Sequence, residues 1–352
     1  MINRRQFLAR LSGFPIMAAF PLPTIAAGLR RYQLTAARVE HPLGGVDKPV
    51  SPMFLYNGES PGPKLTARKG ETLEIDFQNR LDQPTTIHWH GIRNLNEMDG
   101  VANVTQPVVE PGEQFTYRFP VRDAGTFWYH AHNRSFEQVA RGLYGPLIVT
   151  DDEPQNNRRD ILLMADDWRL DADWRFDEAS IGSLHDWSHS GRLGNWLTVN
   201  GQSRPEIPIP QTGFVRLRFV NAANARVLSF QLSRRAPMQI IALDGAPCIP
   251  FNVDTLRLGP AQRADVIVQA GPDLGSLYEV TAGDNFEAAR FVSKRVSESA
   301  LGNISTSPWY PYPDTKDAKL INIHMQGGAM GDLTSAVFEG EEMPIRRLAF
   351  EK

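Results

Sequence analysis

Four of the eight histidines lie in two short motifs, His88-Trp89-His90 and His130-Ala131-His132. On a β-strand, residues two positions apart lie about 6.6 Å apart on the same side, so each motif aims two imidazoles in one direction. Neutral imidazole binds copper, zinc, nickel and iron, and four imidazoles without a thiolate suit copper or zinc best. Because packing seldom requires paired histidines on one face, we interpret these four residues as metal ligands rather than as buried structural histidines.

The single cysteine, Cys248, restricts the other metal sites that this chain could form. One cysteine cannot form a disulfide within the chain, and zinc or iron–sulfur sites with four cysteines are excluded. No histidine lies near Cys248 in the sequence, so we interpret it as a buried structural thiol. His185 and His189 would share one side of a helix and could chelate zinc or form a metal contact on the substrate side, although a solvated loop is the simpler interpretation.

The elements that position the four histidines are predicted to be strands. Apolar residues alternate with polar ones in segments such as 73–77 and 215–219, as expected of half-buried strands. Trp89 and Tyr129 would then face the opposite side of the histidine strands and pack in the core. Glycine (28) and proline (26) are spread along the chain and supply turns between short strands. The pattern predicts an all-β fold.

An internal repeat indicates two related domains. An Asn-Gly pair, a glycine and then an apolar strand occur first as Asn57-Gly58, Gly70 and 73–77, and again as Asn200-Gly201, Gly213 and 215–219. Both intervals are 143 residues (200 − 57 and 213 − 70), which favours a duplicated domain over a solenoid of short units. A third apolar strand, at 320–325, has no Asn-Gly pair near position 343 after it. We therefore expect a third copy that begins and is then cut off.

Length and composition indicate a soluble globular protein with more than one domain. Of its 352 residues, 41% are hydrophobic and 22% charged, and the formal net charge is -3, which argues against disorder and against nucleic-acid binding. The motif Asn3-Arg4-Arg5-Gln6-Phe7-Leu8 precedes a proline-broken apolar stretch that is too short to span a membrane. We interpret the start of the chain as a twin-arginine signal peptide, which predicts export by the Tat translocon to the periplasm and no membrane span.

These observations predict four parts of the chain. They are the signal peptide (1–28), a first domain that carries the four histidines (29–155), a second domain (156–315), and a linker with the truncated start of a third domain (316–352). The closing segment Met343–Phe350 is interpreted as a short helix without a stop signal.

The histidine motifs and the residues around them resemble the copper-binding signatures of the multicopper oxidases, the laccase-like enzymes. In the first domain the resemblance rests on His88-Trp89-His90-Gly91, Asp99-Gly100-Val101, Thr105-Gln106-Pro107, His130-Ala131-His132, Gln138 and Gly142-Leu143-Tyr144-Gly145-Pro146-Leu147. The second domain is similar to that family's metal-free middle domain at Leu197-Thr198-Val199-Asn200-Gly201, Arg218-Phe219-Val220-Asn221, Leu243-Asp244-Gly245 and Gly259-Pro260-Ala261-Gln262-Arg263-Ala264-Asp265. The resemblance implies two tandem cupredoxin-like Greek-key β-sandwiches, with the start of a third.

The resemblance also implies roles for individual residues. His88 would bind the single type 2 copper, whereas His90, His130 and His132 would bind the paired type 3 coppers. Asp99 would be the catalytic carboxylate near this cluster, where it would hold water or pass protons while O2 is reduced.

Two segments of a complete enzyme of this family do not occur in the chain. They are a His-Cys-His segment, whose cysteine binds type 1 copper, and a His-Pro-x-His-x-His segment, and both belong to the family's third domain. The resemblance therefore implies copper at a type 2 and type 3 half-site without a type 1 site. The full-length parent would couple one-electron oxidation of an unidentified reducing substrate to four-electron reduction of O2 to water. This chain alone is expected to be inactive.

Two other functions remain as alternatives to the oxidase. A non-catalytic periplasmic cupredoxin-fold protein, like the family's copper-free relatives in cell division, would have no reason to keep the four histidines. A two-domain laccase or a copper nitrite reductase would suit the length, but both need a type 1 cysteine with histidine partners. The sequence therefore favours the copper oxidoreductase.

Overall fold

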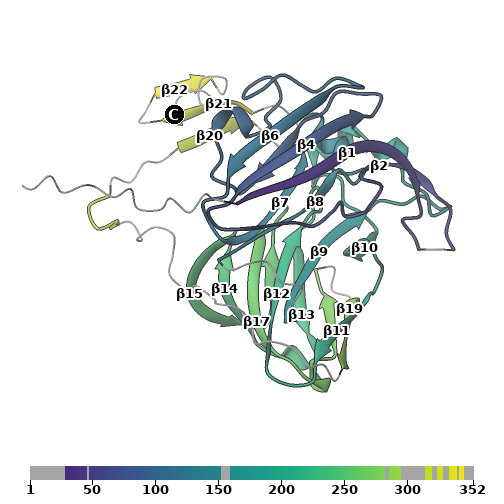
Figure 1. Cartoon of the computed structure of the whole chain (residues 1–352), viewed down its shortest axis with the longest axis vertical. Helices are drawn as coiled ribbons and strands as arrows, with labels where there is room; N and C mark the ends of the chain where they lie inside the picture. The colour runs from purple at the N-terminus through teal and green to yellow at the C-terminus, as the bar shows by residue number, and fades with distance from the viewer. Residues whose placement is uncertain are drawn as a thin grey trace, which may run out of the picture.

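Strands form most of the regular structure of this chain. The computed structural model describes residues 28–45, 47–151, 159–281, 285–294, 314–318, 323–327, 333–338 and 341–344. Most of them lie in two tandem β-sandwiches that stack along the long axis of the molecule (Figure 1). The predicted all-β architecture is confirmed. Within the described ranges no helix is both long and apolar enough to cross a membrane, and the twin-arginine motif lies outside them.

The first sandwich consists of two four-stranded sheets, with strand orders β2-β1-β4-β6 and β3-β8-β7-β5. Its strands are β1 (Leu29–His41), β2 (Ser51–Tyr56), β3 (Leu65–Arg68), β4 (Thr72–Arg80), β5 (Ile87–His90), β6 (Gln114–Pro120), β7 (Gly125–Ala131) and β8 (Tyr144–Thr150). The alternating residues Leu73, Ile75 and Phe77 of β4 are buried in the core between the sheets. The period-two pattern thus predicted the inward face of this strand correctly.

The second sandwich pairs a six-stranded sheet, β10-β9-β12-β17-β14-β15, with a five-stranded sheet, β11-β19-β18-β13-β16. Its strands are β9 (Asp160–Trp168), β10 (Trp196–Val199), β11 (Glu206–Pro210), β12 (Phe214–Asn221), β13 (Leu228–Leu232), β14 (Met238–Leu243), β15 (Ala246–Val253), β16 (Leu256–Leu258), β17 (Arg263–Gln269), β18 (Ser276–Glu279) and β19 (Phe286–Lys294). Val215, Leu217 and Phe219 of β12 lie in its core.

The same turn is built in both sandwiches, which explains the repeat in the sequence. β1 pairs in parallel with β4, and β9 pairs in parallel with β12. Asn57 and Asn200 both take a left-handed backbone conformation, with φ of 54° and 51°. Each asparagine side chain accepts a backbone N–H from the first strand of its sandwich and donates to a carbonyl of the same strand. Asparagine suits both requirements, because it tolerates this backbone conformation and its side-chain amide forms hydrogen bonds with nearby backbone groups.

The remaining described elements are short. The helices are α2 (Ser135–Gln138), α3 (Leu184–Ser188) and the 3-10 segments η1 (Asn96–Met98), η2 (Glu178–Ser180), η3 (Ser233–Arg235) and η4 (Pro272–Leu274). A separate three-stranded antiparallel sheet contains β20 (Ile323–Gly327), β21 (Leu333–Phe338) and β22 (Glu341–Pro344). The helix predicted over Met343–Phe350 is wrong at its start, because Met343 and Pro344 pair with β21; its other residues lie outside the described ranges.

The two sandwiches share a hydrophobic core of their own. Trp128 and Tyr144 of the first sandwich pack there with Met164, Trp168 and Val220 of the second. Strand β7 is consequently buried on both faces, since one face covers the first core and the other meets the second sandwich. The face of β7 that points away from the first core therefore packs against the second sandwich.

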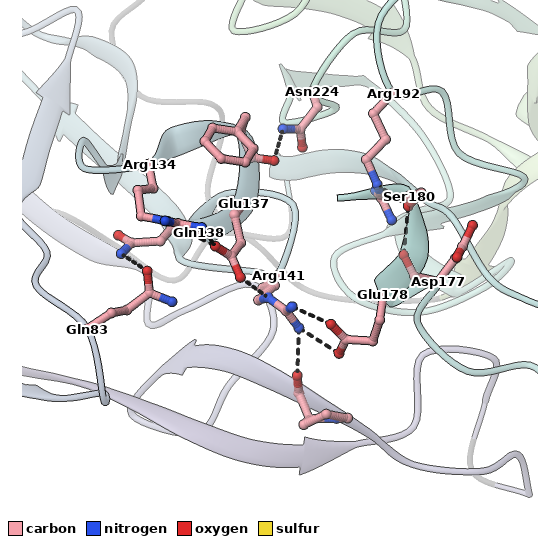
Figure 2. A network of polar contacts seen from close by, with 12 residues as sticks. Gln83, Arg134, Glu137, Gln138, Arg141, Asp177, Glu178, Ser180, Arg192 and Asn224 are labelled. Carbon is pink, nitrogen blue, oxygen red and sulfur yellow. Dashed lines mark hydrogen bonds and ion pairs between the residues drawn. The ribbon is translucent and has the colours of Figure 1, made fainter. Parts of the chain in front are cut away.

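Polar contacts also join the two sandwiches (Figure 2). Arg141, which follows α2, donates to Glu137 at 3.0 Å and to both carboxylate oxygens of Glu178 in η2. Deeper in the interface, Thr126 of β7 donates to the carboxylate of Asp265 at 2.5 Å. The relative position of the sandwiches therefore rests on directional bonds as well as on apolar packing.

Candidate metal centre

Strands β5 and β7 bring the two histidine motifs side by side. They pair antiparallel, with His88 opposite His130 and Trp89 opposite Tyr129. Trp89 and Tyr129 are fully buried in the first core, as predicted, so the histidines of the same strands face the other way. His132 comes directly after β7 and continues the alternation.

All four imidazoles line one cavity of about 490 Å³, whose opposite wall is contributed by the second sandwich. The ring of His88 lies at centroid distances of 5.6 Å from His90, 5.3 Å from His130 and 5.3 Å from His132. His88, His90 and His130 each offer a ring nitrogen, and these atoms lie within 4.8 Å of one another. The structure thus brings together the four residues that the sequence singled out.

Backbone carbonyls orient two of these rings. His88 Nδ1 lies 2.8 Å from the carbonyl oxygen of Asp99, and His130 Nδ1 lies 3.0 Å from that of Ala131. Because a carbonyl oxygen only accepts, both Nδ1 atoms carry the hydrogen and each Nε2 keeps its lone pair. His130 Nε2 lies 3.2 Å from His90 Nδ1. His90 and His130 therefore face each other through ring nitrogens.

Burial keeps three of the four imidazoles, those of His88, His90 and His130, neutral. Burial, followed by the positive charge of Arg263, lowers the pKa of His90 to about 3. Burial outweighs the hydrogen bond of Nδ1 and lowers the pKa of His130 to about 3. Burial also lowers the pKa of His88, against the opposing effect of Asp99. Neutral imidazole is the form that binds metals, so protons compete weakly for these nitrogens at neutral pH.

Asp99 lies behind His88 and not in the cavity. Its carboxylate Oδ1 is 3.6 Å from His88 Nδ1, the atom that donates to its carbonyl. The Asp99 side chain is 31% exposed and is not among the described residues that line the cavity. Asp99 is therefore in contact with the far side of the His88 ring.

The other candidates from the sequence lie elsewhere. Cys248 is in β15, a strand at the edge of its sheet as described, and it packs against the second core while remaining only partly buried, so the interpretation as a fully buried thiol is wrong. Partial burial raises the pKa of this thiol. His185 belongs to α3 rather than to a loop, and His189 follows directly, with the two rings stacked 4.4 Å apart. Among the described residues, the only cluster of three or more candidate ligands is His88, His90 and His130.

Two residues to which the sequence assigned no role at the site contact the histidine strands. The ring of Trp128 lies 4.4 Å from that of His130 and 5.4 Å from that of His90. Its position two residues before His130 on one strand is the signal that could have revealed it. Arg263, at the start of β17, reaches from the second sandwich to Gly91, and no local pattern points to that contact.

Family comparison agrees with the site and the fold. One profile described as multicopper oxidase matches residues 41–154, and a second with the same description matches residues 160–298. The chain belongs to the multicopper oxidase family. Membership implies a copper cofactor, and it identifies the two sandwiches as cupredoxin-like. A set of neutral imidazoles with available Nε2 lone pairs suits copper, so the residues present fit the family's metal.

Relatives and solved structures show how much of a multicopper oxidase this chain covers. The multicopper oxidase MmcO of Mycobacterium tuberculosis is 30% identical over 342 residues, which cover 83% of this chain and 66% of that protein. Laccase-1 of Botryotinia fuckeliana is 33% identical over 249 residues, or 68% of this chain and 42% of that protein. The crystal structure of a multicopper oxidase from Pseudomonas thermotolerans matches with a TM-score of 0.75 at 34% identity, covering 85% of this chain and 72% of that one. This chain therefore spans 66% and 42% of the two curated relatives.

Proposed function

We propose that His88, His90, His130 and His132 bind copper and form half of an O2-reducing copper cluster. The observation that carries this proposal is the convergence of four imidazoles on one cavity, three of them with ring nitrogens within 4.8 Å of one another. By resemblance to the family, His88 holds the type 2 ion and the other three histidines hold the type 3 pair.

The reaction proposed for the whole protein couples two half-reactions. A reducing substrate gives up electrons one at a time, and four electrons with four protons convert O2 to two molecules of water. Bound copper supplies the one-electron redox chemistry. Residues of this chain fix the tautomers of His88 and His130, and burial keeps the imidazoles of His90 and His130 neutral. Trp128 covers one side of the site.

Asp99 is proposed to position His88 and to hold or pass a proton next to it. Its carbonyl fixes the His88 tautomer, and its carboxylate lies 3.6 Å from the same ring nitrogen. Since its side chain is 31% exposed, it connects the far side of the ring with solvent.

The other half of the cluster and the type 1 copper are proposed to come from a further cupredoxin domain, because the family's His-Cys-His and His-Pro-x-His-x-His segments lie in that domain. In this division the first domain spans 29–155, the second 156–315, and 316–352 forms the linker and the start of the third. Residues 1–28 are proposed to direct export to the periplasm through the Tat translocon. O2 and a reducing substrate are the proposed partners of the whole protein.

A copper titration of the purified chain tests the proposal. Equilibrium dialysis with electron paramagnetic resonance should show Cu2+ with imidazole nitrogen ligands, and His88→Gln/His130→Gln should weaken this binding by at least about tenfold. The matched control is His41→Gln, at the end of β1 and outside the cavity, which should leave it unchanged. Equal copper binding by the double variant and the wild type would overturn the proposal and favour the non-catalytic alternative.

A further inference from the structure

A second pair of imidazoles lies on the outer side of α3. His185 and His189 are both exposed, their ring centroids are 4.4 Å apart and their planes differ by 17°. Ser183 caps the start of the helix, where its side chain accepts the N–H of Asp186, and one helical turn brings residues four positions apart onto one side. Two imidazoles are therefore held next to each other in contact with solvent.

Local hydrogen bonds prepare His189 for ligation. Its Nδ1 lies 2.9 Å from the carbonyl oxygen of His185 and 3.2 Å from the hydroxyl of Ser188. Since the carbonyl only accepts, Nδ1 carries the hydrogen and the lone pair is on Nε2. His185 Nδ1 is 3.9 Å from the Asp186 carboxylate, which is too long for a hydrogen bond, so no such bond to this carboxylate restrains the ring.

One ion pair lies next to the two histidines. Arg169 lies 2.8 Å from the Asp186 carboxylate and 3.4 Å from that of Asp177, so this guanidinium holds the Asp186 side chain in place. Arg169, Asp186 and both histidines line one small cavity of about 350 Å³. An ion that entered this cavity would meet two imidazoles, and the charges of Asp186 and Arg169 there would offset each other.

We propose that His185 and His189 bind a divalent transition-metal ion from solution. The expected order of affinity is Cu2+ above Ni2+ and Zn2+, because imidazole sites follow the general stability order of these ions. Asp186 lines both this cavity and the four-histidine cavity, so α3 separates the two sites. The outer site rests on its own residues and does not require the proposed copper cluster.

The test is a Cu2+ titration of the full chain and three variants, followed by electron paramagnetic resonance and equilibrium dialysis. His185→Gln/His189→Gln should lose one bound equivalent and its imidazole nitrogen couplings, while His88→Gln/His130→Gln should retain that equivalent. His185→Gln alone should lower the Cu2+ affinity of the outer site about a hundredfold. Once one imidazole of a linked pair has bound the ion, the second imidazole meets that ion at a high effective concentration. Leu184→Gln, at an exposed position of the same helix, is the matched control and should bind as the wild type does.

The two proposals fail in different ways. If His185→Gln/His189→Gln binds as many equivalents as the wild type with the same midpoint, the outer site does not exist, whatever the inner variant does. A second measurement uses only the wild type, so its result does not depend on whether the variant folds. Zn2+ should protect His185 and His189 from modification by diethyl pyrocarbonate in peptide mass analysis, and equal modification with and without Zn2+ would also overturn the proposal.

Discussion

The guanidinium of Arg263 occupies the space that a side chain at Gly91 would need. A Cβ built on Gly91 would lie 2.2 Å from Arg263 Nη2, and Gly91 has a φ of +88°. Arg263 is 3% exposed and donates to the carboxylate and the carbonyl of Asp244 at 3.0 and 2.9 Å. Because Gly91 follows His90, the second sandwich sets the backbone path at the end of a histidine strand.

Gly91→Ala should lower the free energy of unfolding by about 2–3 kcal/mol, since a left-handed alanine is strained and Arg263 must also move. The matched control is Gly70→Ala, because Gly70 has the same φ of +88° and nothing within 4 Å of its built Cβ. The control should show only the backbone strain, about 1–2 kcal/mol. Urea unfolding measures both, and equal losses would show that Arg263 moves aside freely.

Thr126→Val should destabilise the protein by about 1–3 kcal/mol, because two buried charged partners lose a hydrogen bond. The Thr126 hydroxyl donates to Asp265 at 2.5 Å and accepts from Arg218 at 2.8 Å across the interface. Thr126→Ser keeps the hydroxyl and should lose only a methyl group, about 0.8 kcal/mol. Chemical unfolding that ranks serine below valine in stability would contradict this role of the hydroxyl.

Arg141→Met should cost about 2–4 kcal/mol, because it leaves a mostly buried carboxylate without one of its cations. Arg141 bridges Glu137, whose side chain is 11% exposed, and Glu178, whose side chain is 51% exposed (Figure 2). Glu178→Gln removes the exposed partner and should cost less than about 1 kcal/mol. Unfolding curves compare the two, and limited proteolysis between the sandwiches should accelerate only in Arg141→Met.

Asp166 should make the free energy of unfolding decrease as pH rises. Its carboxyl group is buried and lies 2.6 Å from the Tyr144 hydroxyl, and burial, followed by the charge of Asp167, raises its pKa well above the usual value. The folded chain then keeps a proton that the unfolded chain releases near about pH 4. The stabilisation is complete below that pH and is lost as pH rises toward the folded pKa. Asp166→Asn should flatten this decline in urea unfolding between about pH 4 and pH 8, and parallel pH profiles would refute the assignment.

The copper-loaded chain should lack the intense visible absorption of a copper–thiolate bond. Cys248 is half-exposed in β15, and among the described residues it joins no cluster of three candidate ligands. Cys248→Ser should therefore leave the visible spectrum of the copper-loaded chain unchanged. A band that disappears in this variant would identify Cys248 as a ligand.

The pairing of histidines within each motif could be predicted because its cause is local. Alternation along a strand places His88 with His90 and His130 with His132, whereas the two motifs meet through the pairing of β5 with β7. The repeat was predictable for the same reason, since Asn57 and Asn200 each tie a turn to a nearby strand.

The contacts that cross between sandwiches could not be predicted in this way. Arg263 meets Gly91 only because the shared core of Trp128 and Tyr144 docks one sandwich on the other. Cys248 was interpreted as buried because no histidine lies near it in the sequence, and that observation does not reveal that its strand lies at the edge of a sheet. Both outcomes depend on the order of strands in space.

The indole of Trp128 provides this centre with an optical reporter. It is 3% exposed and lies 4.4 Å from the His130 ring and 5.4 Å from the His90 ring. A paramagnetic ion held by those rings would quench the indole's emission, so filling of the cavity could be followed in unlabelled protein as a fall in fluorescence. Subtracting the signal of a Trp128→Phe variant would isolate this indole from the other tryptophans, and a time course would then give the rate at which ions enter and leave.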